Sequence, residues 1–134
     1  MTETFPAEKA SLNDAMDFIT AGLEQAGASM KTVMEVQLAF EEIFVNIASY
    51  AYGEEGGTAE VSYETDGGCA VIGLSDSGSP FDPFGRPDPD VFAKASDRSI
   101  GGLGIFMAKK LMDECLYEYS DGHNKVTMKK KIGG

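Results

Sequence analysis

The sequence predicts a two-layer α/β sandwich, with helices on one side and antiparallel strands on the other. Two segments in the first 51 residues repeat apolar residues at helical spacing, and two later segments have the alternation and turn residues of β-hairpins. A glycine-led apolar segment, GGLGIFMAKKLMDE at 101–114, stands between the two hairpins. A helix layer packed on an antiparallel sheet buries the apolar faces of both. We therefore expect one domain, residues 1–134, in the order helix, helix, hairpin, long loop, helix, hairpin.

The first predicted helix covers residues 11–26. Its apolar positions are Leu12, Met16, Ile19 and Leu23. Ser11 is a suitable N-cap for this helix and Gly27 a suitable stop. The short stretch before Pro6 is expected to form an edge strand, because proline has no N–H to give to a second neighbouring strand.

The remaining elements follow from two further changes of period. A second helix is predicted over residues 32–51. Its apolar stripe consists of Val33, Val36, Phe40, Ile43, Phe44 and Ile47. Residues 58–78 alternate, turn at two consecutive glycines and return, and residues 115–132 repeat this around DGHN, so each segment predicts a hairpin. Residues 79–100 hold four of the five prolines and no period, which is typical of a functional or disordered loop.

Composition excludes several classes of protein. The formal net charge of −11 argues against non-specific binding to nucleic acid or anionic membrane, so a protein partner is expected instead. The sequence contains no run of about 18 apolar residues, and MTETFPAEKA lacks the pattern of a signal peptide. Cys69 and Cys115 match no metal-binding spacing and are expected to be reduced thiols of a cytoplasmic protein. His123 lies in a predicted turn and is expected to be a solvated surface residue.

Glu42 and Asn46 lie four residues apart on the second predicted helix, so they share one of its faces. At about 100° per residue, this face lies roughly 150° from the centre of the apolar stripe. A carboxylate can accept a proton or orient a water molecule, and an amide oxygen suits Mg²⁺. The pair therefore predicts either a solvated polar face or part of a site.

Asp76 ends an apolar predicted strand, and Gly78 follows two residues later. An Asp-x-Gly sequence after a strand is typical of a simple turn, because aspartate caps backbone amides and glycine adopts unusual φ angles. If Asp76 were buried and ionised, it would need hydrogen-bond donors, and the amino group of adenine is one. A turn and a nucleotide contact both remain open at this position.

Gly101, Gly102 and Gly104 introduce the third predicted helix. GLGIFM matches only the start of GxGxxG, because Met107 takes the third glycine's place, and no strand precedes it, so a dinucleotide-binding fold is not supported. The sequence has no GxxxxGK[ST], which excludes a P-loop. Free N–H groups at a helix N-terminus bind phosphate, and glycines let it approach closely. The glycines therefore form either a tight turn or an anion site.

Taken in chain order, these features resemble the ATP-binding module shared by sensor histidine kinases, gyrase, Hsp90 and MutL (the GHKL or Bergerat fold). They are more similar still to the small stand-alone anti-sigma factor serine kinases. AFEEIFVNIASYAYGE resembles the N box of this family, and LSDSGSPFDP its first glycine box. GGLGIFMAKKLMDECLYEYSDGHNKVTMKK resembles the second glycine box and the terminal hairpin. The resemblance covers nearly the whole chain and implies a mixed, mostly antiparallel sheet with helices on one face.

The resemblance implies a role for each candidate residue. Asn46 would coordinate the Mg²⁺ that bridges the ATP phosphates, and Glu42 would be the general base, directly or through water, for the attacking hydroxyl. Asp76 would accept a hydrogen bond from the adenine amino group, and Gly78 would let the base lie close. Tyr50 stands where many relatives carry a basic side chain or histidine.

Further phosphate and base contacts are implied for the second half of the chain. The glycines whose backbone amides would face the phosphates are Gly101, Gly102 and Gly104. Residues 79–100 would form the ATP lid, and Arg98 is the basic side chain best placed to reach a phosphate. Thr127 would help to hold the adenine through its hydroxyl.

The function that the resemblance implies is that of a cytoplasmic protein serine/threonine kinase. It would use ATP and Mg²⁺ to phosphorylate a STAS-type anti-anti-sigma protein, and it would sequester a sigma factor or another regulator. Relatives of this kind suggest a homodimer. A second hypothesis is a non-catalytic ATP-binding module whose nucleotide-ordered lid controls protein binding. A third is an α/β domain without a ligand.

Overall fold

The computed structural model describes residues 1–52, 56–80, 82–84 and 102–132 of the chain. The strands are β1 (Thr2–Pro6), β2 (Thr58–Asp66), β3 (Cys69–Asp76), β4 (Glu114–Ser120) and β5 (His123–Lys131). The helices are the 3-10 turn η1 (Lys9–Ser11), α1 (Leu12–Gln25), α2 (Met30–Tyr50) and α3 (Gly102–Leu111). The predicted order of helices and hairpins is confirmed.

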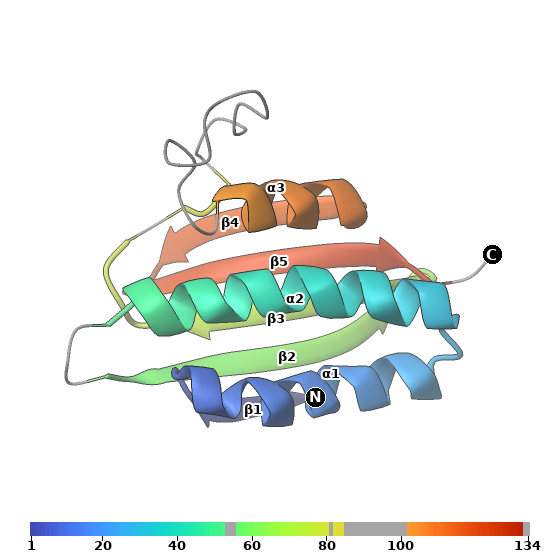
Figure 1. Ribbon diagram of the computed structural model, residues 1–134, viewed down its shortest axis with the longest axis horizontal. Helices are drawn as coiled ribbons and strands as arrows, with labels where there is room; N and C mark the ends of the chain where they lie inside the picture. Colours follow the sequence, from blue (N-terminus) through green and yellow to red (C-terminus); the bar gives the residue numbers. More distant parts are fainter. Residues whose placement is uncertain (53–55, 81, 85–101, 133–134) are drawn as a thin grey trace.

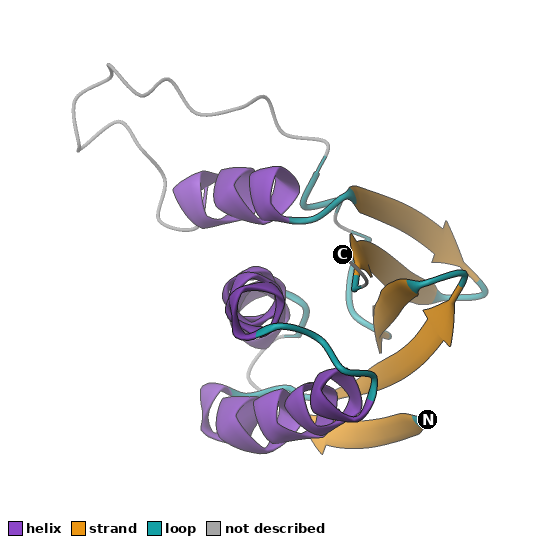
Figure 2. Ribbon diagram, turned by 90° about the vertical axis from the view of Figure 1, so that its right-hand side faces the viewer, coloured by secondary structure: helices purple, strands orange, loops and turns teal. Residues whose placement is uncertain are grey.

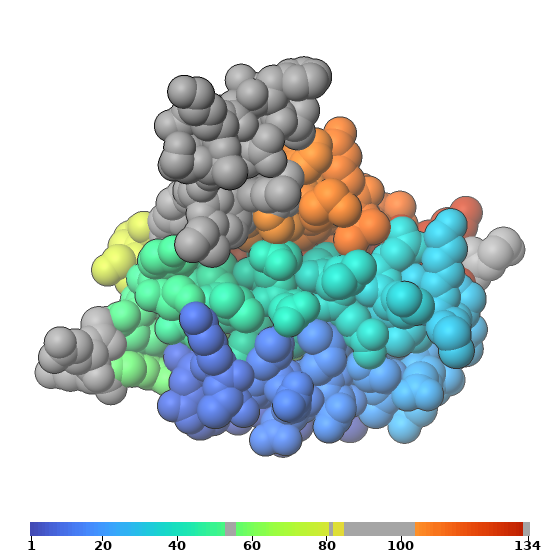
Figure 3. Space-filling view, in the orientation of Figure 1, coloured from blue at the N-terminus to red at the C-terminus, as the bar shows by residue number. Residues whose placement is uncertain are grey.

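The strands form one five-stranded sheet in the order β1-β2-β3-β5-β4. The helices cover one face of it, with α2 between α1 and α3 (Figures 1, 2 and 3), which is the predicted two-layer sandwich. Every pairing among the described strands is antiparallel, so the expectation of a mixed sheet is wrong. The reason is the path of the chain, which crosses from β3 through α3 to the edge strand β4 and then returns beside β3 as β5.

The start of α1 differs from the prediction. Ser11 precedes the helix as expected, but its side chain makes no capping hydrogen bond, and its φ and ψ of −86° and −8° are already helical. The turn η1 runs directly into α1 and buries Ser11, so the hydroxyl is not placed as a cap. The predicted stop is confirmed, because Gly27 has φ of +80°. Pro6 ends β1, which lies at the predicted edge of the sheet.

The central helix α2 supplies the middle of the core. The buried members of its predicted stripe are Val36, Phe40, Ile43, Phe44 and Ile47. The helix begins two residues earlier than predicted because the Ser29 hydroxyl accepts a hydrogen bond from the Thr32 N–H at 3.1 Å. Burial of the stripe fixes the rotation of α2, which leaves Glu42 and Asn46 partly exposed, away from the core.

The two hairpins turn at residues with left-handed backbone angles. Gly67 and Gly68 connect β2 to β3 with φ of 58° and 84°, and Asp121 and Gly122 connect β4 to β5 with φ of 55° and 77°. Positive φ at both central residues is typical of the tight hairpin turns that match strand twist. His123, which follows the second turn, is exposed as predicted.

The cysteine thiols are free, as predicted. Burial raises the pKa of the Cys115 thiol to about 11, so it is protonated at neutral pH and is a poor nucleophile. Within the described residues, no helix combines the length and the apolar character needed to cross a membrane.

We expect Gly22→Ala to destabilise the fold. Gly22 on α1 packs against the ring of Tyr63 on β2, and a Cβ at Gly22 would be 2.6 Å from Tyr63 Cδ1. Tyr63 is only 8% exposed, so its ring has little room to move. The free energy of unfolding, measured by urea denaturation, should fall by about 1–3 kcal/mol even though alanine favours helix.

The matched control is Ala21→Gly at the neighbouring exposed position, which changes only helix propensity and should cost about 1 kcal/mol. A Gly22→Ala protein more stable than the wild type would contradict the steric argument.

Candidate nucleotide-binding site

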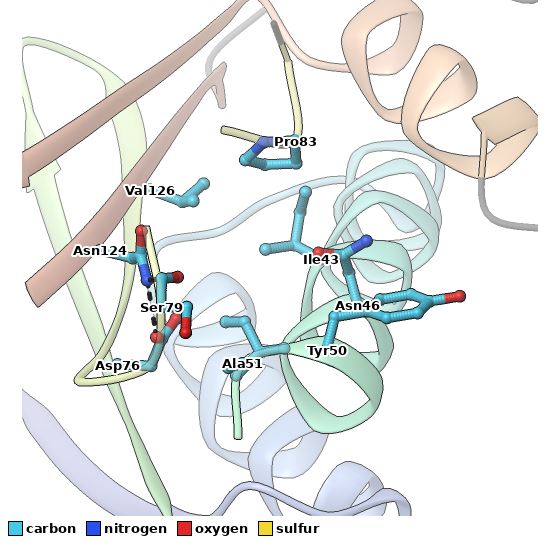
Figure 4. A pocket seen from close by; sticks show the side chains of 10 residues that line it. Ile43, Asn46, Tyr50, Ala51, Asp76, Ser79, Pro83, Asn124 and Val126 are labelled. Atoms are coloured by element: carbon cyan, nitrogen blue, oxygen red, sulfur yellow. Dashed lines mark hydrogen bonds between the residues drawn. The ribbon is translucent and has the colours of Figure 1, made fainter. Parts of the chain in front are cut away.

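A pocket opens where the C-terminal half of α2 faces the end of β3 and the start of β5 (Figure 4). Its lining consists of Ile43, Asn46, Ile47, Tyr50, Ala51, Asp76, Ser79, Pro83, Asn124 and Val126. The empty space inside it, with the part open to solvent included, is about 330 Å³. Apolar side chains with a few convergent polar groups are the usual composition of a small-molecule site.

Asp76, the last residue of β3, is buried in the pocket wall and only 5% exposed. Its Oδ1 accepts two hydrogen bonds, from the Gly78 N–H at 2.8 Å and from the Asn124 side-chain amide at 2.9 Å. Within the described residues, neither bond uses Oδ2. The hydrogen bond from Gly78 closes the Asp-x-Gly turn that the sequence predicts. Asp76 is also buried, as a carboxylate that contacts a ligand in the pocket would be. One carboxylate oxygen therefore remains available to accept a hydrogen bond from a bound molecule.

Gly78 packs against the C-terminal end of α2. A Cβ at Gly78 would be 2.0 Å from the Ala51 carbonyl oxygen, and the Ser79 N–H donates to that carbonyl at 3.2 Å. The Tyr52 hydroxyl accepts a hydrogen bond from the Ser77 N–H at 2.8 Å and ties the same segment to α2. The space that Gly78 leaves is therefore filled by the protein's own backbone, where the sequence analysis expected a base.

Asn46 and Tyr50 lie one turn apart on α2, and both line the pocket (Figure 4). The Asn46 amide oxygen is a hard oxygen of the kind that Mg²⁺ prefers. Tyr50 is 60% exposed. It brings an uncharged aromatic ring to the position at which the sequence comparison noted a basic side chain or histidine in many relatives.

Glu42 lies one turn before Asn46 on α2 and faces the first turn of α3. A Cβ at Gly104 would be 1.8 Å from Glu42 Oε2 and 2.2 Å from its carboxyl carbon. The carboxylate therefore occupies the space that any other residue at position 104 would fill. The close approach of α3 to Glu42 depends on this glycine.

The environment of Glu42 changes its acidity. Burial raises the pKa of the Glu42 carboxyl, and the neighbouring Glu41 carboxylate raises it further. A carboxylate with a raised pKa is a stronger base than an ordinary glutamate. Glu42 thus combines basicity with a position beside the pocket.

Thr127 does not lie at the pocket. β5 alternates between the two faces of the sheet, so Asn124 and Val126 are buried under the helices while Thr127 faces the opposite side. Thr127 pairs with Gly73, whereas Asn124 pairs with Asp76. The role expected for Thr127 therefore does not fit this geometry.

Asn124 is the pocket residue that the sequence analysis missed. It is 4% exposed, and its amide also donates to the Ser79 carbonyl at 2.9 Å. The sequence feature that could have identified Asn124 is the alternation of the last strand, which places Asn124 on the same, core-facing side as the apolar Val126. Pairing with Asp76 depends on strand register, which that alternation alone does not give.

Part of the predicted phosphate site lies outside the described residues. Arg98 and Gly101 lie outside the described residues, and so do most of the predicted lid residues 79–100. Gly102 begins α3 and Gly104 lies in its first turn, so the predicted glycine-led helix start is present.

The pocket residues fit an adenine nucleotide that carries Mg²⁺. Asp76 offers an acceptor for an amino group, Ile47 and Val126 offer apolar surface, and Asn46 offers an oxygen ligand. Among the described residues there is no group of three or more histidine, cysteine or acidic side chains that could hold a metal ion alone. Asn46 is the pocket residue whose amide oxygen would serve as a ligand for Mg²⁺ bound with the nucleotide phosphates.

Comparison with known proteins agrees with this geometry. Residues 5–130 match the histidine kinase-like ATPase domain family. The serine-protein kinase RsbW of Listeria monocytogenes is 32% identical over 110 residues, which cover 78% of this chain and 70% of the relative. The RsbW of Listeria innocua is 31% identical over the same shares of both chains.

Solved structures show the same fold. The RsbU and RsbW domains of a Mycobacterium tuberculosis protein superpose with a TM-score of 0.64 at 14% identity, over 98% of this chain and 32% of that one. The Acinetobacter baumannii histidine kinase AdeS superposes with a TM-score of 0.55 at 13% identity, over 100% of this chain and 68% of that one. With the family match over residues 5–130 and the pocket at the end of α2, the chain belongs to the histidine kinase-like ATPase family.

Proposed function

We propose that this chain is an ATP-dependent protein serine/threonine kinase that acts as an anti-sigma regulator. The observation that carries the proposal is the arrangement of Asp76, Asn46 and Glu42, which follow one another from the pocket wall to the start of α3. Kinase activity is supported by the relatives, which are named serine-protein kinases. These relatives also support use of ATP and partner switching.

The proposed substrate is a serine or threonine of a STAS-type anti-anti-sigma protein. Partner switching would follow from charge, because a phosphate on the STAS protein changes the affinity of that protein for the kinase. The kinase would then bind a sigma factor or another regulator. A homodimer, a cytoplasmic location and a single-domain chain stay predictions.

The proposed mechanism rests on positioning, because phosphoryl transfer needs aligned groups and neutralised charge more than covalent chemistry. Asp76 would fix the base at one end of the pocket. Asn46 would hold the Mg²⁺ that neutralises phosphate charge. Glu42, one turn along α2, would accept the proton of the attacking hydroxyl.

We expect Glu42→Ala to separate catalysis from binding. Removing the base should lower phosphotransfer by at least about 100-fold, while the Kd for Mg-ATP changes by less than about threefold. Asp76→Asn should instead weaken ATP binding by at least about tenfold, because an amide offers donors to the adenine amino group. Calorimetry measures binding, and incubation with labelled ATP and a candidate STAS-domain protein measures transfer.

The non-catalytic alternative is decided by the same experiment. Tight Mg-ATP binding by the wild type without phosphorylation of any STAS partner would refute the kinase and leave the binding module. Unchanged ATP binding in both Asp76→Asn and Asn46→Ala would refute the site itself.

We expect Glu41→Gln to shift the pH dependence of phosphotransfer. Glu42 acts as a base only when ionised, so the rate falls as the pH drops through its pKa. Burial and Glu41 raise that pKa, which places this acidic limb at a higher pH than an ordinary glutamate would give. Loss of the Glu41 charge should move the limb to lower pH, and only partly, because burial is the larger cause. The rate of transfer, measured from acidic pH, where an ordinary glutamate is protonated, up to neutral pH, gives the position of the limb.

Glu24→Gln, an exposed change on α1, is the control and should leave the limb in place. If the limb of the Glu41→Gln protein coincides with that of the wild type, Glu42 is not the titrating base.

We expect Gly104→Ala to reduce kcat and not stability. The new Cβ would push the Glu42 carboxylate out of position, and displacement of a catalytic group by about 1 Å can cost ~100-fold in rate. Alanine favours helix over glycine by about 1 kcal/mol, so the Tm should be unchanged or higher. The measurements are kcat, the Kd for Mg-ATP and thermal unfolding.

Met107→Ala on the exposed side of α3 is the control for changes in this helix. A parallel loss of ATP affinity and kcat in Gly104→Ala would mean that the new methyl group meets the phosphates and not the carboxylate.

A further inference from the structure

We propose that Tyr117 sets the preference for adenine over guanine nucleotides by holding Asn124, which in turn holds Asp76. The inference rests on the proposed nucleotide site. Tyr117 lies on β4 and is not part of the pocket lining, so it is a positioning residue that acts through Asn124.

The orientation of the Asn124 amide follows from its neighbours. Its nitrogen lies 2.9 Å from Asp76 Oδ1 and 2.9 Å from the Ser79 carbonyl oxygen, and both of these atoms only accept hydrogen bonds. The nitrogen must therefore point toward them, which turns the amide oxygen toward β4. The Tyr117 hydroxyl donates to that oxygen. The orientation of one amide is thus fixed at both of its ends.

Strand geometry explains why Tyr117 can reach this amide. Tyr117 is opposite Val126 in the β4–β5 ladder, so Asn124 is its diagonal neighbour on the same face of the sheet. Asn124 is 4% exposed, and water has little access to replace a lost partner there. A tyrosine hydroxyl on an edge strand therefore controls a buried group in the pocket wall.

The consequence for the ligand lies in the chemistry of the purine edge. The bonds from Gly78 and Asn124 hold Oδ1 of Asp76, which keeps the carboxylate fixed with its other oxygen available. A carboxylate accepts the 6-amino donor of adenine and repels the 6-oxo acceptor of guanine. Without the Tyr117 hydroxyl, the Asn124 oxygen loses this hydrogen bond, and the amide is held less firmly in the orientation that donates to Asp76 Oδ1. A carboxylate that can turn away discriminates less between the two purines.

The test is the substitution Tyr117→Phe in the full chain, with Tyr119→Phe as the matched control. Tyr119 lies on the same strand and is opposite Asn124, and no hydrogen bond of its hydroxyl is recorded within the described residues. The Kd values for Mg-ATP and Mg-GTP are measured by calorimetry, with thermal unfolding beside them. In Tyr117→Phe, the ratio of the GTP Kd to the ATP Kd should fall by about fivefold, the effect of one buried hydrogen bond. In Tyr119→Phe the ratio should stay at the wild-type value.

The outcomes separate this inference from the proposed function. A Tyr117→Phe protein that unfolds at a lower temperature but keeps the wild-type ratio would show a purely structural role and overturn the inference. A wild type that selects ATP, loses selectivity in Tyr117→Phe and never phosphorylates a partner would support the inference while refuting the kinase. A wild type that binds ATP and GTP equally would overturn the inference whatever its kinase activity.

Discussion

The hydrogen bond between Asn124 and Asp76 is the contact on which the pocket depends. It joins the end of β3 to the start of β5, across 48 residues of sequence. The same amide donates to the Ser79 carbonyl and so holds the segment that follows β3 against the pocket. An ionised carboxylate is costly to bury without donors, and Asn124 and the Gly78 N–H supply them. The Asn124 side chain therefore holds both the Asp76 carboxylate in the pocket wall and the segment that follows β3.

The other half of the site depends on the rotation of α2. Buried side chains such as Phe40 and Phe44 turn one side of this helix toward the core. The other side then carries Glu42, Asn46 and Tyr50 at four-residue spacing. The proposed contact to the base lies on the sheet and the proposed catalytic groups lie on the helix, and the core joins these two elements. Any change that rotates α2 would move Glu42 and Asn46 together.

The part of the site that could be predicted is the part whose geometry is local. Glu42 and Asn46 share a helix face wherever the helix lies, so spacing alone was sufficient to place them together, while their roles came from the resemblance. Asn124 depends on the register between β3 and β5, which no local pattern contains. Thr127 was assigned from the resemblance, but the strand's period of two puts it with the lysines on the outer face and Asn124 with Val126. The two hairpins of the sheet were likewise predicted from local patterns. The pairing of β3 with β5, which joins the hairpins, could not be predicted and is known only from the structure.

Gly78 and Gly104 show that a glycine motif does not by itself identify which atoms occupy the space that the missing side chain leaves. The family resemblance implied that Gly78 and Gly104 let a nucleotide approach the backbone. In the folded chain the space beside Gly78 holds the Ala51 carbonyl, and the space beside Gly104 holds the Glu42 carboxylate. Each glycine first brings two elements of the protein together, Gly78 at the pocket wall and Gly104 beside the pocket. A nucleotide would then meet surfaces that exist only because these approaches are close, so the glycines act on the ligand through the shape of the protein.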